Sequence, residues 1–488
     1  MRSNALQLGS RTLTEIKPGI WRVEPQGKMR VGVNIIASKN LILQIKDDKS
    51  IEQAANVATL PGVLDPVLTM PDIHQGYGFP IGGVAAFHEK TGVVSPGGVG
   101  YDINCGVRVL TTNISVQQLK NNKMTKRLVS ELFDVVPCGV GSKRKDLELS
   151  MGQLDSILAD GASWAVKNGF GDLSDLDFIE EKGRLIFADP EKVSQRARER
   201  GHNQLGTLGS GNHFLEIQAV DTIFDKAKAL AFGLEPDHIV IMIHTGSRGL
   251  GYQVCSEYIE LALNTASKYG IELVDRELAA LPLESVEGKS YLGAMAAAAN
   301  FAFNNRQIIS FWVKETFKRH FPNIEFKILY DICHNIAKWE EFHFPSHRNS
   351  QRVCIHRKGA TRAYPPRHPS LPQPYLATGQ PVIVPGDMGR FSFILAGSAN
   401  SMELSLGSAC HGAGRELSRA QAKKQARGRS ISRELEEHGV FLKASGRDTV
   451  EEEMPEAYKD INEVVEAIRH AKIASFVARL KPVGVIKG

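Results

Sequence analysis

Short runs of β-branched and aromatic residues recur along the chain and predict strands, because such side chains suit a pleated, partly buried surface. Five of these runs are Arg108–Thr112, His238–Ile243, Phe326–Tyr330, Pro381–Val384 and Phe391–Leu395. Polar residues that could take part in chemistry follow two of these runs: His244 follows the second run and His334 follows the third. Loops at strand ends are where rigid scaffolds present functional groups.

A helical period of apolar residues appears in three other segments, Gly293–Phe321, Arg415–Ala426 and Val464–Leu480. In the first, Gly293 precedes a long Ala-rich amphipathic stretch. The mixture of strands and helices predicts an α/β fold of the mixed α+β kind. The Pro-rich stretch Tyr364–Pro374 is interpreted as an extended loop inside a domain, and no internal repeat or linker is visible, so one large domain spanning residues 1–488 is predicted.

Composition and charge narrow the class of protein only slightly. The formal net charge of +5 permits a polyanionic partner without requiring one. Met1–Ser10 lacks the pattern of a signal peptide, and no apolar run reaches the length of a bilayer span. The cysteines are scattered without the spacing of a secreted scaffold, which predicts reduced thiols in a cytoplasmic protein without a membrane partner: Cys105, Cys138, Cys255, Cys333, Cys354 and Cys410.

A set of metal-ligand residue types is spread over several segments. Asp102 and Cys105 lie in a Gly-rich loop, and from that loop alone a tight turn with a buried cysteine is the better interpretation. His213, His244 and His334 each stand beside glycine or polar residues, and together with the loop they indicate a metal site. Five candidate ligands exceed what one catalytic ion usually takes, so a binuclear site bridged by Cys105 would use them all. Ligand type leaves zinc, manganese and magnesium open.

His411 is the strongest candidate for a reacting side chain. It precedes Gly412 and Gly414, and glycines at a helix start expose backbone N–H groups to an anion. The predicted helix then carries Arg415 and Arg419 four residues apart on one face. A histidine beside a phosphate cradle and two guanidinium groups favours phosphoryl or nucleotidyl transfer. The alternative is a Gly-rich turn that caps an ordinary basic helix.

Other phosphate-handling motifs are absent from the sequence. The chain has no Gly-x4-Gly-Lys-Ser/Thr loop, and Gly206–Gly211 lacks the spacing of a dinucleotide-binding turn. It also has no Lys-x-Asp-Gly sequence, which marks ligases with a lysine nucleophile. If a nucleotide is attached covalently, His411 is therefore the better candidate.

Taken together, these segments resemble the RtcB family of RNA ligases, from about Asp72 to the last residue. The resemblance is carried, in this order, by Asp102–Cys105, Gly211–His213, His244–Arg248, Cys333–Asn335, His356–Ala363, Pro385–Gly389, His411–Arg415 and Val485–Gly488.

The resemblance implies an α/β fold with central sheets and surrounding helices around a deep cleft that holds two Mn²⁺ ions. Asp102, Cys105 and His213 would hold one ion, and Cys105, His244 and His334 the other. It implies that His411 attacks the α-phosphorus of GTP to form a histidine–GMP phosphoramidate. The GMP then passes to an RNA 3′-phosphate, and a 5′-hydroxyl RNA end displaces it. A 2′,3′-cyclic phosphate end is first opened to the 3′-phosphate.

The resemblance also implies a guanine nucleotide pocket. Glu216 and Lys487 would match the donors and the carbonyl of the guanine edge, and Asp387 stands where some relatives have Ser or Thr. The family positions of the pocket are Asn212, Glu216, Asn335, Pro385, Gly386, Asp387, Met388, Ser392, Gly412, Ala413, Gly414, Tyr458 and Lys487. Contacts to RNA phosphates would come from Arg200, Arg248, Lys358, Arg415 and Arg419.

A second hypothesis is a metal-dependent phosphodiesterase or phosphatase acting on RNA ends, with His411 as an acid–base residue and no need for GTP. A non-catalytic RNA-binding subunit would leave the convergence of Cys, His and Asp unexplained. The sequence leaves open whether the RNA is tRNA, mRNA or damaged RNA, and whether an archease-type activating protein takes part.

Overall fold

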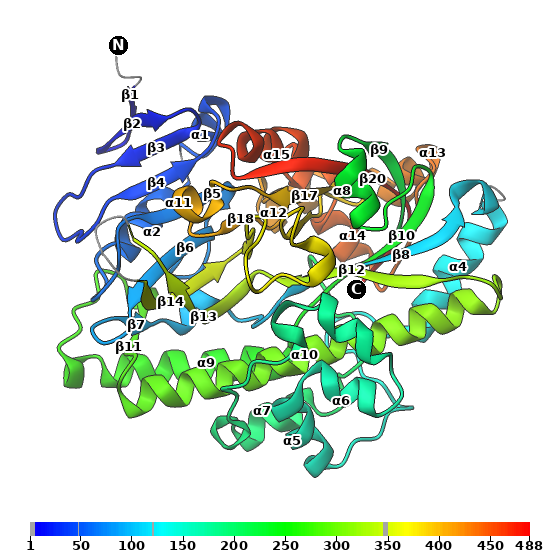
Figure 1. The fold of residues 1–488 in the computed structure, drawn as a ribbon, viewed down its shortest axis with the longest axis horizontal. Coiled ribbons are helices and arrows are strands. Elements are labelled where there is room, and N and C mark those ends of the chain that lie inside the picture. The colour runs from blue at the N-terminus through cyan, green and yellow to red at the C-terminus, as the bar shows by residue number, and fades with distance from the viewer. Residues whose placement is uncertain (1–4, 47, 120–121, 345–349) are drawn as a thin grey trace.

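The computed structural model describes residues 5–46, 48–119, 122–344 and 350–488. Two large sheets lie side by side, with long helices packed beneath them (Figure 1). The mixed α/β fold predicted from the sequence is confirmed. Of the segment Met1–Ser10, the first four residues lie outside the described part of the chain, and the rest begins the first strand.

The first large sheet is formed mainly by the N-terminal part of the chain. Its neighbouring strands are antiparallel except for one parallel pair, β4 with β5. In spatial order the strands are β1 (Ala5–Leu8), β2 (Arg11–Lys17), β3 (Ile20–Val23), β4 (Val33–Ile36), β5 (Val67–His74), β6 (Ile81–His88), β14 (Gln351–Lys358) and β13 (Asn335–Phe342).

The second large sheet contains all five strands predicted from the sequence. In spatial order it consists of β12 (Phe326–Cys333), β8 (Gly106–Ser115), β10 (His238–Thr245), β9 (Phe214–Ile223), β20 (Ala474–Lys487), β17 (Ser392–Gly397) and β16 (Pro381–Val384), with β19 (Phe441–Ala444) parallel to β20. Two small sheets pair β7 (Val93–Val94) with β11 (Leu281–Pro282), and β15 (Ala360–Arg362) with β18 (Ser408–Cys410).

The longest helix, α10 (Val286–Lys318), runs beneath both sheets beside α9 (Arg248–Thr265) (Figure 1). It begins earlier than predicted because the side chain of Ser285 accepts a hydrogen bond from the Gly288 amide. Its middle is buried on every side, so it is not amphipathic as the sequence suggested. Arg306 on this helix donates to the carbonyls of Asn104 and Thr245, and thereby fixes two loops of the site described below.

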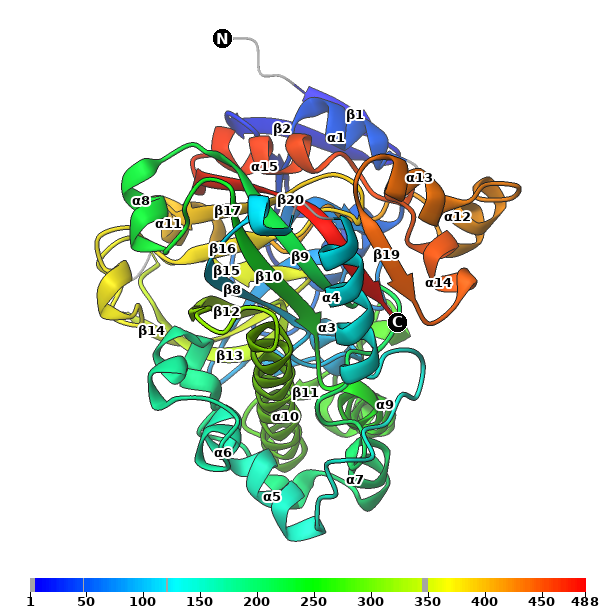
Figure 2. The ribbon, with the colours of Figure 1, turned by 90° about the vertical axis from the view of Figure 1, so that its right-hand side faces the viewer.

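The remaining helices are short. They are α1 (Lys39–Gln44), α2 (Ser50–Val57), α3 (Pro96–Val99), α4 (Asn122–Val135), α5 (Met151–Asp160), α6 (Ala162–Lys167), α7 (Gln195–Gly201), α8 (Lys226–Ala231), α11 (Ser401–Ser405), α12 (Arg419–Gln425), α13 (Ile431–Glu437), α14 (Arg447–Glu452) and α15 (Ile461–His470). The helices α12, α13 and α14 gather beside β19 on one flank (Figure 2).

The helix predicted over Val464–Leu480 is wrong in its second half. The helix α15 ends at His470, and Lys472 then adopts a left-handed backbone with φ of 58°. From Ala474 the chain is the long strand β20, which pairs with β9 and β17. An apolar run that fills the middle of a sheet is easily mistaken for a continued helix, since both carry many buried residues.

The helix predicted over Arg415–Ala426 begins four residues late. Ser418 and Gln421 form a capping box, so α12 starts at Arg419, while Arg415 makes an isolated bridge with Tyr458. The prediction that Arg415 and Arg419 share one helical face is therefore wrong. His411 likewise follows strand β18 and does not stand at a helix start.

Two further findings concern the helices and the cysteines of the described residues. None of their helices is long and apolar enough to cross a membrane. All six cysteines are free thiols.

Candidate active site

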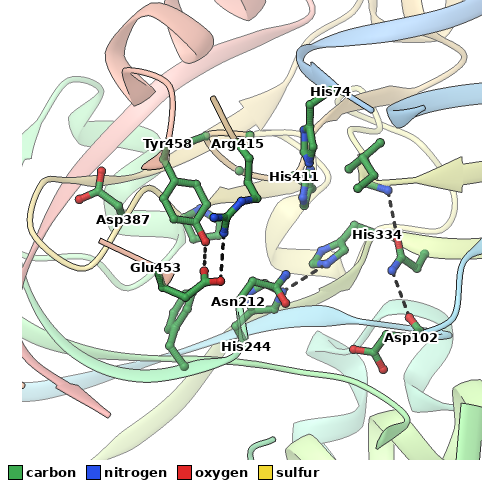
Figure 3. Close-up of a pocket in the computed structure, with 18 of the residues that line it drawn as sticks. His74, Asp102, Asn212, His244, His334, Asp387, His411, Arg415, Glu453 and Tyr458 are labelled. Atoms are coloured by element: carbon green, nitrogen blue, oxygen red, sulfur yellow. Dashed lines mark hydrogen bonds and ion pairs between the residues drawn. The ribbon is translucent and has the colours of Figure 1, made fainter. Parts of the chain in front are cut away.

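Loops and strand ends from both large sheets enclose a cavity of about 390 Å³ (Figure 3). Of the residues predicted for the site, those that line it are Asp102, Asn212, Glu216, His244, His334, Asn335, Lys358, Pro385, Gly386, Asp387, Met388, His411, Gly412, Ala413, Gly414, Arg415, Arg419, Tyr458 and Lys487. The predicted positions outside this lining are Cys105, His213, Ser392, Arg200 and Arg248, and they are placed below.

The five candidate metal ligands converge. The Cys105 Sγ lies 3.4 Å from the His213 Nε2 and 3.2 Å from the His244 Nε2. The His213 Nε2 is 2.7 Å from the Asp102 Oδ2, and the His244 Nε2 is 3.3 Å from the His334 Nε2. They form two groups that share Cys105, each with its donor atoms within 4.8 Å of one another.

Strand register brings these ligands together. Cys105 directly precedes Gly106, which pairs with Thr245 of β10 on one side and with Cys333 of β12 on the other. His244 and His334 are thus held beside Cys105 by the same backbone ladder. His213 directly precedes β9, whose first residue pairs with His244.

The protonation states favour a cation in this cluster. Burial and the nearby Asp102 raise the pKa of Cys105 well above its usual range, so its thiolate needs a positive charge beside it. Burial, aided by neighbouring positive groups, lowers the pKa values of His244 and His334, which keeps both imidazoles neutral. Burial acts to raise the pKa of Asp102, but His213 and other positive groups bring it down to about 2. Neutral imidazoles, a carboxylate and an ionisable thiol are a suitable donor set for a divalent metal.

His411 is held by Asp72, a residue that the sequence reasoning missed. The His411 Nδ1 lies 2.6 Å from the Asp72 Oδ2, which also accepts the backbone N–H groups of His411 at 3.0 Å and Gly412 at 3.3 Å. A carboxylate accepts the Nδ1 proton, so the Nε2 lone pair is left free. The His411 ring stands 4.8 Å from that of His334, on the cavity side of the metal cluster (Figure 3).

Gly414 shows why the loop after His411 needs glycine. Its φ is 73°, and a Cβ at this position would lie 2.3 Å from the Asp72 carbonyl oxygen. The tight loop therefore packs against the residue that orients His411. The glycine pattern in the sequence reflects this close approach, and it does not mark a helix start.

Glu216 and Lys487 both line the cavity. Burial raises the pKa of Glu216 to about 7, against the opposing effects of Gln218 and Lys487. Ser392 lies behind this carboxylate, where its hydroxyl accepts from Gln218 and from the Gly386 amide at 3.3 Å. It supports the pocket wall but does not line the cavity. This differs from the family resemblance, which implied that Ser392 is one of the pocket positions.

Glu453, which the sequence reasoning also missed, links several pocket residues. Its carboxylate is 3.0 Å from Arg415 and 3.6 Å from Lys487, and it accepts the hydroxyl of Tyr458 (Figure 3). Arg419 approaches it to 3.9 Å. In the sequence Glu453 ends an ordinary acidic run, so no local signal distinguishes it.

The other predicted cations differ in their surroundings. Lys358 is buried and donates to the carbonyls of Gly97, at 2.9 Å, and Tyr77. Arg248 lies behind the metal cluster and donates to Thr207 at 3.3 Å. Arg200 is exposed and donates to Gln253 at 2.9 Å. Lys358 is therefore part of the cavity wall, whereas Arg248 and Arg200 lie outside the cavity lining.

Asp387 turns its carboxylate onto its own loop. It accepts the amides of Gly389 and Arg390, both at 3.0 Å, and pairs with the Arg390 side chain. Burial raises its pKa despite these partners. Its side chain therefore shapes the loop Pro385–Gly389.

An oriented histidine beside a candidate set of metal ligands is an arrangement suited to phosphoryl or nucleotidyl transfer. A family model described as "tRNA-splicing ligase RtcB" matches residues 53–488. The chain is 51% identical to the tRNA-splicing ligase RtcB of Thermococcus kodakarensis over 94% of its own length and 95% of that protein's. It is 50% identical to the same ligase of Archaeoglobus fulgidus, over 94% and 95% of the two chains. The chain belongs to the RtcB family of ligases.

Proposed function

We propose that this RNA ligase joins RNA 3′-phosphate or 2′,3′-cyclic phosphate ends to 5′-hydroxyl ends, in tRNA splicing or RNA repair, through a histidine–GMP intermediate. The observation that carries the proposal is the His411 ring, oriented by Asp72 at 2.6 Å and facing a Cys/His/Asp cluster in the same cavity. A phosphodiesterase with His411 as an acid–base residue would need the same metals but no GTP, so dependence on GTP separates the two functions.

The proposed reaction has three steps. The Nε2 lone pair of His411 attacks the α-phosphorus of GTP, and pyrophosphate leaves as the new N–P bond forms. The 3′-phosphate of the RNA then displaces the imidazole, which gives an RNA end activated by GMP. The 5′-hydroxyl of the second RNA attacks that end, and GMP leaves. Asp72 offsets the positive charge that His411 gains in the first step.

Two Mn²⁺ ions fit the donor set, one held by Asp102, Cys105 and His213 and the other by Cys105, His244 and His334. Bound metal would offset phosphate charge and polarise the phosphorus centre. The choice of Mn²⁺ over Zn²⁺ rests on the family resemblance.

In this proposal the guanine base lies beside Glu216 and Lys487. The buried carboxylate can accept the two N–H donors of the guanine edge, and the ammonium can donate to its carbonyl. Tyr458 and Asn212, which also line the cavity, complete the wall of this half. The RNA phosphates would be contacted by Arg200, Arg248, Lys358, Arg415 and Arg419, as the family resemblance implies.

An archease-type activating protein and a cytoplasmic location remain part of the proposal, as does a single domain over residues 1–488. The last is supported by one continuous apolar cluster that reaches from the N-terminal strands through α10 to α15.

The decisive experiment is transfer of radiolabel from α-labelled GTP to the protein. The wild-type chain with Mn²⁺ should become labelled, and the label should be labile in acid but stable in alkali. His411→Ala should take up no label yet bind metal as before. Labelling of wild type and His411→Ala alike would refute the assignment, and RNA-end cleavage without GTP dependence would favour the phosphodiesterase.

A further inference from the structure

A row of aromatic rings leads from the cavity to the protein surface. Tyr77 and Tyr101 line the cavity, with ring centroids 5.5 Å apart in an edge-on arrangement. Tyr101 stacks in turn on Tyr252, with centroids 4.8 Å apart and planes within 24°. Tyr252 lies in the first turns of α9 and is 48% exposed. The row is therefore continuous with the site and open at its outer end.

Positive charge flanks the outer end of this row. The guanidinium carbon of Arg200 lies 5.2 Å from the centroid of the Tyr252 ring. Arg200 belongs to α7, which packs against α9 (Figure 2). Arg248 begins α9 and lies close enough to Asp102 and Cys105 to interact with their charges. Flat aromatic faces combined with guanidinium groups are the surface that unpaired nucleobases and their phosphates recognise.

Internal packing explains only part of this arrangement. Tyr101 has ring neighbours on both sides, as a core residue would. Tyr252, in contrast, leaves almost half of its surface to solvent, and its hydroxyl has no hydrogen-bond partner among the described residues.

We propose that Tyr252, supported by Tyr101 and Arg200, is a stacking site for the bases of a single-stranded RNA next to the end that reacts in the cavity. The inference rests on the proposed function, and it adds a base-binding surface outside the nucleotide pocket and the metal cluster. Stacking accepts any base, because every base has a π-face. Such a site suits an enzyme that must hold ends of different sequence.

The test compares Tyr252→Leu with Tyr252→Phe in the full-length, Mn²⁺-loaded protein. A short fluorescein-labelled RNA with a 3′-phosphate is titrated and its dissociation constant measured by anisotropy. Tyr252→Leu should bind about tenfold more weakly because a ring is lost, and Tyr252→Phe should bind within about twofold of wild type. Equal affinity of wild type and Tyr252→Leu would overturn the proposal, and a surface for a protein partner would then be the better explanation. Equal weakening in both variants would overturn it as well.

Phe224→Leu is the matched control. Phe224 is 47% exposed and stacks on Phe393 with centroids 6.4 Å apart, but it follows the end of β9 that is remote from the cavity. Its loss should leave RNA affinity unchanged, and equal weakening there would mean that any exposed ring has the same effect, which contradicts the proposal.

Two further measurements separate stacking from charge and from the ligase chemistry. Arg200→Gln should reduce the slope of log affinity against log salt by about 0.7, whereas Tyr252→Leu should keep the wild-type slope, because it removes no charge. Attachment of GMP to the protein involves no RNA, so Tyr252→Leu should be labelled at the wild-type rate. Absence of labelling in wild type would refute the proposed function, whereas normal labelling with unchanged RNA affinity would refute only the stacking site.

Discussion

The candidate metal ligands of the cavity and its arginine Arg415 are held in place in different ways. Cys105, His244 and His334 stand at the ends of neighbouring strands, where backbone register alone brings them together. Arg415 lies in an irregular segment, where a carboxylate 38 positions along the chain, Glu453, holds it. Ligand types at strand ends could therefore be predicted from local sequence, whereas the partner of an arginine could not. The predictions below test whether the metal ligands and the arginine are also separate in function.

The largest effect is expected from Cys105→Ala. Because both ligand groups share this thiol, both should lose metal, whereas His334→Ala should spare the group of Asp102 and His213. Loss of the metals should slow GMP attachment by at least about three orders of magnitude, if they contribute several kcal/mol. Metal content is measured by mass spectrometry, with the buried Cys354→Ala as control. If Cys105→Ala retained one metal ion, the two metal sites would not share the Cys105 thiol.

Asp72→Asn should have the next largest effect. The Asp72 Oδ2 also accepts the backbone N–H groups of His411 and Gly412, so the amide oxygen of Asp72→Asn should take its place and still accept the Nδ1 proton, but the negative charge that offsets the charge gained by His411 is lost. Single-turnover GMP attachment should fall by about two orders of magnitude or more, while metal content stays at the wild-type level. A rate within about threefold of wild type would mean that Asp72 only packs against the loop.

Smaller effects on the rates of GMP attachment and RNA sealing are expected from Arg415→Ala and Arg419→Ala, and they should differ between the two. The side chain of Arg415 is 19% exposed and is bound to Glu453, which also contacts Lys487, so Arg415→Ala should weaken GMP attachment and RNA sealing alike, by roughly tenfold. Arg419 is 60% exposed and its ion pairs are long, so Arg419→Ala should slow sealing alone, by roughly fivefold or less. Both rates are measured by single turnover on the same preparations. If both variants lost only the rate of RNA sealing, Arg415 and Arg419 would form a shared RNA-binding surface, as the sequence analysis predicted.

The structure also shows what the sequence could and could not reveal. Asp72 carried a usable signal, since it is an ionisable residue inside the largely buried strand β5. The capping box of Ser418 and Gln421 was likewise visible in the sequence and would have placed the start of α12 correctly. Glu453 had no such signal, because its importance comes from tertiary contacts. The end of α15 depended on a left-handed Lys472, a conformation that this residue type does not predict.

An effect on affinity, not on rate, concerns the pH dependence of nucleotide binding at Glu216. Burial raises its pKa to about 7, so a large fraction of the carboxyl is protonated in the free protein near neutral pH. Guanine donors favour the carboxylate and lower this pKa on binding, so binding releases a proton. The affinity for GTP should therefore rise from about pH 5.5 to 7 and level off above, by roughly tenfold in all. Calorimetry in buffers of different ionisation enthalpy measures the proton release directly, and Glu216→Gln should abolish both the release and the pH step. An unchanged pH step in Glu216→Gln would assign the titration to another group and would place the guanine edge elsewhere in the cavity.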